Sequence, residues 1–258
     1  QYYQAVVHAA WPNNKRKPFD DPRVRRAMHL MLDRPTLVEV VKDLSPTMVG
    51  GFIYPFSEFA TPIKELEKKP GYQNDPTAAV KEAKALMAAA GYGNGAKGLD
   101  MLVRDLPNTK LWAQALQTMF AETLGVQMNP RIAVESVWFD DARTGNFDMA
   151  LGVIVSSLLD PSDYFRAWYH VDGPQNASFW NNAAFNDALL KIDRETDTAK
   201  RLALIRQELE SGFATVFRQT MMVRYELDAY GARAGGQALT PDRLSEFWFS
   251  RNEQYYGD

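Results

Sequence analysis

The apolar pattern of the chain is clearest over 145–169, where it predicts a turn, a buried strand, a loop and a helix. The strand is expected over 147–155, because a nearly continuous apolar run is typical of a strand covered on both faces. Ser156 and Ser157 end this run, and Asp160 followed by proline is typical of a helix start. Open α/β sheets hold their ligands in such loops, between the end of a strand and the next helix.

Strands and helices are predicted to alternate through the middle of the chain. The predicted elements are a strand at 99–105, a helix at 108–124, a strand at 126–134, a short helix at 136–144 and the strand at 147–155. This βαβαβ order predicts an α/β fold with a mainly parallel sheet flanked by helices and joined by right-handed crossovers. Pro130 indicates that its strand lies at an edge of the sheet or carries a bulge.

The remaining segments add elements on either side of this middle part. Further strands are predicted at 1–10 and 221–232. Further helices are predicted after the capping residues Asp21, Asp33 and Asp75, over 161–169, 183–194 and 198–217, and after Thr240. Segment 44–74 has many Pro, Gly and aromatic residues without a period, which is typical of a wrapping or functional loop.

Composition narrows the class of protein. A hydrophobic content of 46% excludes a disordered chain, and a net charge of −3 gives no electrostatic reason to expect nucleic acid or an anionic membrane as partner. The absence of cysteine excludes disulfides and thiol nucleophiles. Residues 1–14 lack the basic start and apolar core of a signal peptide and begin as if in mid-strand. We therefore expect a fragment of a longer protein.

Four segments, taken in order, resemble a known family. They are PFDDPRVRRAMHLMLDR (18–34), AVKEAKALMAAAGYGNG (79–95), GNFDMALG with DPSDYF (145–165) and FNDALLKIDRETDTAKRLALIRQ (185–207). Each alone is an ordinary capped helix or strand, but their order and spacing resemble the second lobe of the family 5 extracytoplasmic solute-binding proteins. That family contains the dipeptide-, oligopeptide- and nickel-binding components of ABC importers.

The resemblance implies an organisation and a function. Residues 1–258 would form a single C-terminal lobe with a periplasmic-binding-protein-like fold, and residues 1–10 and about 230–258 would run to an N-terminal lobe. The family implies a periplasmic or extracytoplasmic protein that closes two lobes on a small-molecule or peptide ligand and delivers it to the transmembrane subunits of an ABC permease. It implies neither catalysis nor a cofactor, and a membrane contact only through a lipid anchor outside this sequence.

The resemblance also implies ligand contacts on the strand at 147–155 and the loop after it. Peptide-binding relatives often carry an Asp for the ligand ammonium where this chain has Ser157, a Trp at Ile154, and in some members an Arg at Leu151. A hydroxyl offers only neutral hydrogen bonds, so these three departures favour a less charged and more apolar cleft. The alternative for Leu151 and Ile154 is plain sheet core.

Four more residues are candidate ligand contacts. Ser156 has a hydroxyl at the strand end, and Arg104 ends the strand at 99–105 before a loop. Trp138 lies in the short helix before the 147–155 strand, and Trp180 follows a Gly-Pro loop. The alternatives are local backbone hydrogen bonding for Ser156, an exposed salt bridge for Arg104, and packing for the two tryptophans.

Two other classes of protein compete with an importer component. A hydrolase has little support, because His8, His29 and His170 do not form an HExxH motif and no G-x-S-x-G motif is present. A ligand-sensing domain of a transcriptional regulator is the second alternative. The basic runs at 15–17 and 23–26 fit that hypothesis, although the acidic net charge favours a solvated face.

Overall fold

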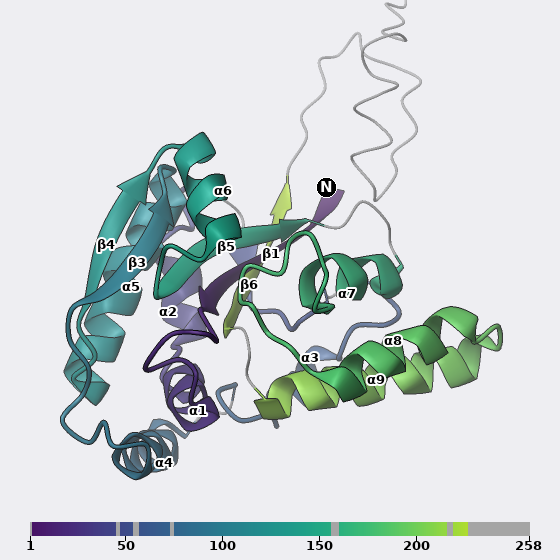
Figure 1. Ribbon diagram of the computed structural model, residues 1–258, viewed down its shortest axis with the longest axis horizontal. Coiled ribbons are helices and arrows are strands. Elements are labelled where there is room, and N and C mark those ends of the chain that lie inside the picture. Colours follow the sequence, from purple (N-terminus) through teal and green to yellow (C-terminus); the bar gives the residue numbers. More distant parts are fainter. Residues whose placement is uncertain are drawn as a thin grey trace, which may run out of the picture.

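A six-stranded sheet runs through the molecule and carries helices on both faces (Figure 1). The structure is a computed structural model that describes residues 2–44, 47–53, 57–72, 75–155, 160–215 and 219–226. The strands are β1 (Tyr2–Pro12), β2 (Thr47–Met48), β3 (Leu99–Arg104), β4 (Met128–Ala133), β5 (Met149–Val155) and β6 (Gln219–Glu226).

The sheet has the strand order β2-β6-β1-β5-β3-β4 and is mixed. β3 pairs in parallel with β4 and β5, whereas β1 lies antiparallel between β5 and β6, and β2 is antiparallel to β6. Consequently β3, β4, β5 and β6 run in one direction, and β1 and β2 in the other. The predicted α/β class is confirmed, and β1 and β2 are the antiparallel additions to its parallel βαβαβ part.

The helices begin and end mostly where the sequence predicts. They are α1 (Pro22–Leu30), α2 (Arg34–Glu39), α3 (Ile63–Leu66), α4 (Pro76–Ala89), α5 (Pro107–Leu124), α6 (Glu135–Thr144), α7 (Pro161–Tyr169), α8 (Ala183–Arg194) and α9 (Thr198–Thr215). Asp21, Asp33 and Asp75 cap α1, α2 and α4 through side-chain oxygens, as predicted. Segment 44–74 is not wholly irregular, because it contains β2 and α3. The helix predicted after Thr240 lies outside the described residues.

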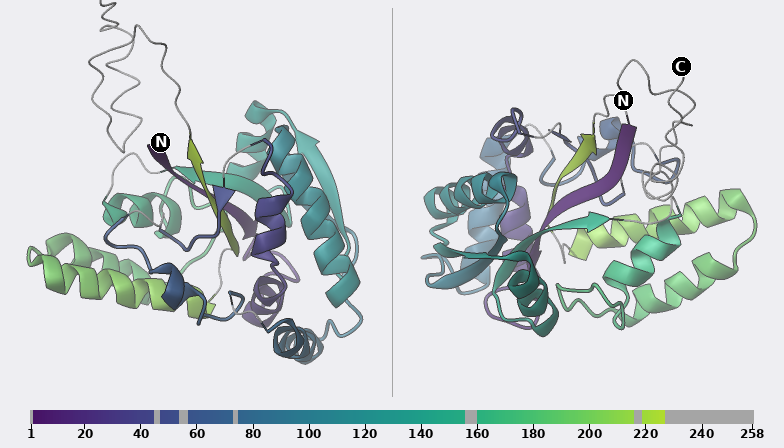
Figure 2. Two further views of the ribbon diagram at one scale, coloured as in Figure 1. Left: turned by 180° about the vertical axis from the view of Figure 1, so that it is seen from behind. Right: turned by 90° about the horizontal axis from the view of Figure 1, so that it is seen from above.

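The two faces of the sheet bury two separate hydrophobic cores. Ala10, Met101 and Leu151 belong to the core shared with α1, α4 and α5, whereas Ala9, Leu102 and Ala150 belong to the core shared with α6, α7, α8 and α9. Neighbouring residues of each strand therefore point to opposite faces, as strand geometry requires. Figure 2 shows that α8 and α9 lie side by side and extend away from the sheet.

The pairing register defines two ends of the sheet. Val6 of β1 lies opposite Val155 of β5, and Tyr2 lies opposite Glu226 of β6. The start of β1 and the ends of β3, β4, β5 and β6 thus share one side, which we name the carboxyl edge. Pro12 lies opposite Met149 at the other side, the amino edge. The carboxyl edge is where α/β sheets place their ligands.

Candidate functional site

An arginine and a glutamate meet at the carboxyl edge. Arg104 ends β3 and lies opposite Ala133, which ends the parallel neighbour β4, so the first residue of α6, Glu135, falls beside it. The Arg104 Nη2 pairs with the Glu135 Oε1. The guanidinium carbon of Arg104 lies 5.4 Å from the ring centroid of Phe139. The Arg104 side chain is only 18% exposed, whereas that of Glu135 is 65% exposed.

Several large apolar side chains of the neighbouring elements are open to solvent. Ile132, Val134, Val137 and Phe139 are 53%, 57%, 47% and 52% exposed. They come from the end of β4 and the first half of α6. Large apolar residues grouped at one surface mark an interaction or ligand-binding surface more often than isolated ones do. The carboxyl edge therefore offers one charged pair with the half-exposed ring of Phe139 beside it.

A buried tryptophan pair lies beneath α6. The rings of Trp11 in β1 and Trp138 in α6 have centroids 5.7 Å apart, and both residues are 3% exposed. Gly152 of β5 makes room for them, because a Cβ at this position would lie 2.5 Å from Trp11 and 2.8 Å from Trp138. The Trp138 Nε1 and the Arg104 Nε are buried without a hydrogen-bond partner in the part of the chain that the structure describes. Such buried donors are uncommon in folded proteins.

Arg131 fixes α6 to the sheet. Its Nη2 donates to the Asp100 Oδ2 of β3 at 2.8 Å, and its Nη1 donates to the Asp141 Oδ2 of α6 at 2.5 Å. Hydrogen bonds from Arg131, and then from Asn146, hold the pKa of Asp141 below its usual range. Because α6 carries Glu135, Trp138 and Phe139, this network positions the candidate site.

Helix α7, which follows the loop after β5, begins as predicted. Asp160 caps α7 by accepting a hydrogen bond from the Ser162 backbone N–H at 2.8 Å. The Arg201 Nη2 of α9 also donates to the Asp160 Oδ1 at 2.7 Å. Burial would raise the pKa of Asp160, but the hydrogen bonds from Arg201 and Ser162 outweigh burial and hold that pKa below its usual range. Asp160 is therefore a helix cap and an anchor for α9.

The ligand contacts predicted on the 147–155 strand and in the loop after it are described only in part. Ser156 and Ser157 lie outside the described residues, so their predicted ligand contacts stay predictions. Ile154 pairs with Val7 through the backbone, and its side chain is also outside the description. Leu151 is 0% exposed in the core shared with α1 and α5, which favours its interpretation as sheet core.

Of the other predicted contacts, Arg104 and Trp138 both lie beside Phe139, whereas Trp180 lies elsewhere. Trp180 is 5% exposed and packs on Phe185 with ring centroids 5.0 Å apart. Its loop lies at the amino edge, because the Asn14 backbone N–H donates to the Ser178 carbonyl at 2.9 Å just after β1. Packing in the core, the alternative for Trp180, is therefore favoured.

Several residues of this region were not among the predicted contacts. Trp11, Glu135, Phe139 and Gly152 come from three different elements. Glu135 and Phe139 lie four residues apart on one helix, and this spacing places them on the same face. That spacing was a usable signal, whereas the approach of Trp11 to Gly152 depends on the pairing of β1 with β5.

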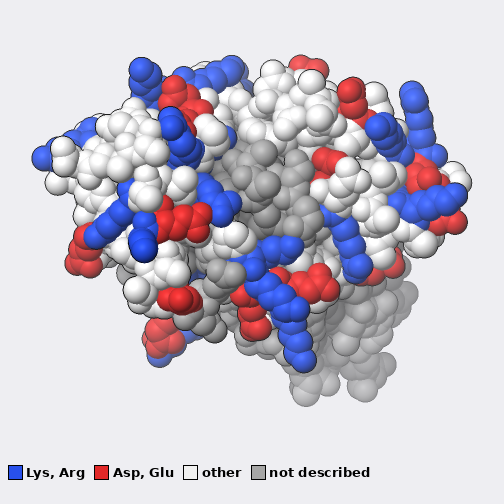
Figure 3. Space-filling model, turned by 90° about the horizontal axis from the view of Figure 1, so that it is seen from below, with Lys and Arg blue, Asp and Glu red and all other residues white. Residues whose placement is uncertain are grey.

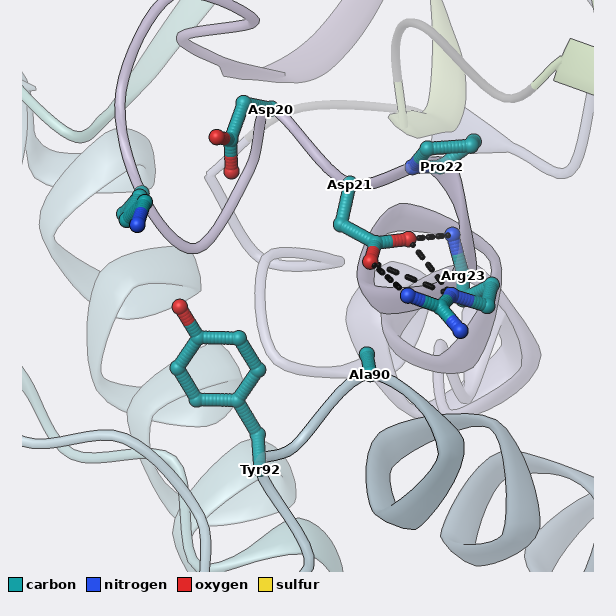
Figure 4. A pocket seen from close by; sticks show the side chains of 7 residues that line it. Asp20, Asp21, Pro22, Arg23, Ala90 and Tyr92 are labelled. Carbon is teal, nitrogen blue, oxygen red and sulfur yellow. Dashed lines mark hydrogen bonds and ion pairs between the residues drawn. The ribbon is translucent and has the colours of Figure 1, made fainter.

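A hollow of about 550 Å³ lies far from this region, at the amino edge (Figure 4). Its lining includes Asp20, Asp21 and Arg23 at the start of α1 and Tyr92 after α4. Arg23 donates to both carboxylate oxygens of Asp21, and the Tyr92 side chain extends toward Asp20. Two of its charged side chains, Asp21 and Arg23, thus pair with each other at the cap of α1.

The described residues lack a metal-binding cluster and a membrane-spanning helix. They contain no group of three or more His, Cys, Asp or Glu side chains that could hold a metal ion. None of their helices is both long enough and apolar enough to cross a membrane.

The family is decided by a match over most of the chain. Residues 1–176 match the model of the bacterial extracellular solute-binding proteins, family 5 Middle. The chain belongs to this family. The resemblance in its sequence is thereby confirmed.

Family 5 relatives align with about three quarters of the chain. The periplasmic oligopeptide-binding protein OppA of Salmonella typhimurium is 26% identical over 208 residues, which are 79% of this chain and 37% of OppA. The probable deoxycholate-binding periplasmic protein YgiS of Escherichia coli is 28% identical over 203 residues, which are 76% of this chain and 36% of YgiS. The chain thus spans little more than a third of these relatives.

Solved structures of family 5 type share the fold. The dipeptide-binding protein of Pseudoalteromonas sp. SM9913, solved with Met-Leu, superposes with a TM-score of 0.80 at 20% identity. The alignment covers 93% of this chain and 47% of that protein. At this identity the likeness shows the fold alone. The predicted periplasmic-binding-protein-like lobe is confirmed.

A shorter part of the chain is similar in sequence to a class of enzymes. The oligoendopeptidase F homologue of Lactococcus lactis is 35% identical over 117 residues, which are 45% of this chain and 19% of the enzyme. A match to one fifth of an enzyme does not carry its activity, because activity depends on a particular set of residues.

Proposed function

We propose that this chain forms one lobe of a two-lobe solute-binding protein that captures a peptide-like or other small solute for an ABC importer. The observation that carries the proposal is the family match together with the composition of the carboxyl edge. A partly buried arginine, an exposed glutamate and the half-exposed ring of Phe139 lie together there, where α/β sheets hold ligands. Ligand capture would follow the hinge closure of two lobes on the solute.

The position of the strand ends supports a partner lobe on this side. The start of β1 and the end of β6 both lie at the carboxyl edge, and Figure 1 draws the N-terminus there as well. The chain spans 37% of OppA, so most of such a relative has no counterpart in this sequence. We infer that residues 2–226 are a single lobe whose open edge would face the second one. We also propose that the protein is exported across the cytoplasmic membrane and that it delivers the solute to the permease subunits.

The test is a binding screen of the 258-residue chain. The panel contains short peptides, nickel chelates, opines, oligosaccharides and deoxycholate, and ligand-observed NMR reports affinities into the millimolar range. We expect one class to bind with a Kd weaker than about 1 μM, because one lobe buries only part of a ligand that two lobes would enclose. Binding by none of the classes would contradict capture of such solutes. A sub-micromolar Kd would contradict the one-lobe organisation.

A peptidase is the second candidate, and the short likeness to oligoendopeptidase F is its only specific support. The same screen separates the two functions, because mass spectrometry of the recovered peptides reports cleavage. A binding protein returns every peptide intact after prolonged incubation, whereas a peptidase returns fragments. The sequence has three histidines and no HExxH motif, which favours intact peptides.

A nucleic-acid-binding role finds no support in the charge distribution. Figure 3 shows Lys and Arg side chains intermingled with Asp and Glu side chains over the face of the molecule seen from below. Arg16, Arg23 and Arg26 from the two basic runs pair with Asp148, Asp21 and Glu82. Paired cations contribute little to phosphate binding, which depends on a concentrated positive surface.

A further inference from the structure

The ion pair between Arg104 and Glu135 uses only one nitrogen of the guanidinium, although an arginine can bind a carboxylate through two. An arginine binds a carboxylate most strongly through two parallel N–H groups. In the same sheet, Arg131 binds Asp100 in this way, with Nε donating to Oδ1 at 3.1 Å and Nη2 donating to Oδ2 at 2.8 Å. Arg104 pairs with Glu135 through Nη2, whereas its Nε has no partner within the described residues.

The two partners also differ in how firmly they are held. Arg104 is anchored at the end of β3, its side chain is 18% exposed and its guanidinium lies beside the ring of Phe139. Glu135 is 65% exposed in the first turn of α6. An exposed carboxylate can move into water at little cost, because exposed ion pairs contribute little stability. The guanidinium therefore stays in place when the carboxylate leaves.

We propose that Arg104 binds a carboxylate of the ligand and that Glu135 occupies this position on the guanidinium until the ligand displaces it. The inference rests on the proposed function and names the class of ligand, an apolar molecule with a carboxylate. The half-exposed Phe139 beside the guanidinium would contact its apolar part, and the exposed Val134, which directly precedes Glu135, offers a second apolar side chain. Phe139 lies beside the guanidinium and is half-exposed, so a ligand bound to Arg104 would also contact its ring.

The test compares two probes that differ only in charge. The first probe is N-acetyl-trileucine, which has a free carboxylate and no ammonium. The second is the same peptide with a C-terminal amide, which is neutral. We expect the chain to bind the acid about tenfold tighter than the amide, as measured by ligand-observed NMR, because hydrogen bonds to a charged group are stronger than neutral ones. Arg104→Gln should remove this preference. Glu135→Gln should raise the affinity for the acid about two- to fivefold and leave the amide unchanged.

A matched control is available in another ion pair. Glu82 pairs with Arg26 at 2.8 Å on a different part of the surface, so Glu82→Gln should change neither affinity. Circular dichroism checks that each variant is folded. If Arg104→Gln does not fold, Glu135→Gln decides the matter, since its side chain is largely exposed.

The outcomes separate this inference from the function on which it rests. Equal affinity for acid and amide, or an unchanged preference in Arg104→Gln, would overturn the role of Arg104. An unchanged acid affinity in Glu135→Gln would overturn the displacement of Glu135. Binding of free trileucine without binding of either acetylated probe would overturn the inference and leave the proposed function standing. If no ligand of the wider panel binds either, both are overturned.

Discussion

Gly152 and Trp11 face each other across β5 and β1 so closely that a Cβ on residue 152 would lie 2.5 Å from the indole ring. We expect Gly152→Ala to lower the free energy of unfolding by about 1–3 kcal/mol, because an added methyl group must displace two buried rings. Urea unfolding followed by circular dichroism measures this change.

The matched control is Gly93→Ala. A Cβ at this position would lie 3.5 Å from its nearest neighbour, which is ordinary contact, so a change within about 0.5 kcal/mol is expected. Equal effects of the two substitutions would mean that the tryptophan pair does not constrain residue 152.

The pairing of Asp141 with Arg131 makes stability depend on pH. The pKa of Asp141 is lowered in the folded state, so its contribution is present above the unfolded pKa, roughly 4, and is lost as the pH falls through the folded pKa. Asp141→Asn should therefore cost about 1 kcal/mol at pH 7, and the difference from wild type should shrink on acidification below about pH 4. Thermal unfolding at a series of pH values measures this.

Its neighbour Asp140 is the control. Asp140 pairs with Arg143 on the exposed surface of α6, with side chains 66% and 71% exposed. Asp140→Asn should change the stability by less than about 0.5 kcal/mol at every pH. A gap between Asp141→Asn and wild type that persists at pH 2 would assign its effect to packing.

Asp160 combines a helix cap with an ion pair, and two substitutions separate them. Asp160→Asn keeps an oxygen that can accept from the Ser162 N–H but removes the charge that faces Arg201. Asp160→Ala removes both, and we expect it to cost about 1 kcal/mol more, which is the usual contribution of a cap. Equal costs, measured by urea unfolding, would mean that the ion pair with Arg201 is the larger contribution.

Asn13 connects the end of β1 to the approach to β5. Its side chain is buried, and its Nδ2 donates to the Gly145 and Phe147 carbonyls at 3.2 and 3.1 Å. Asn13→Asp should lower the free energy of unfolding by about 2 kcal/mol at pH 7, because a buried carboxylate would face two carbonyl oxygens. Unfolding in urea is the measurement, and a change below about 0.5 kcal/mol would contradict this role of Asn13.

Local signals explain why most elements were predictable. Asp21, Asp75 and Asp160 carry the cap and the following proline within adjacent residues, and the structure begins a helix after each. Gly125 and Gly145 end α5 and α6 with φ values of 67° and 78°, which glycine adopts at little cost. The starts and ends of these helices depend on residues that are adjacent in the sequence, so they can be predicted from it.

The candidate site was only partly predictable, because its geometry depends on pairing between distant segments. Arg104 was a candidate from its place at a strand end, but its partner Glu135 follows from the register that sets Arg104 beside Ala133. Trp180 was a candidate because it follows a loop, and yet the bond between Asn14 and Ser178 places that loop at the amino edge. No local sequence pattern predicts the pairing of Arg104 with Glu135 or the position of the loop before Trp180.

The position of β1 between β5 and β6 affects how the chain reaches its fold. β1 is made well before its partners β5 and β6, because β2, β3 and β4 and most of the helices lie between them in the sequence. Contacts between residues so distant in sequence form slowly, because the entropy of closing a long loop must be lost first. β1 is thus made before both of its neighbours in the sheet and can pair only after they follow. Until β5 and β6 are made, both edges of β1 lack the partners that they have in the native sheet, and unpaired strand edges of this kind are prone to aggregate.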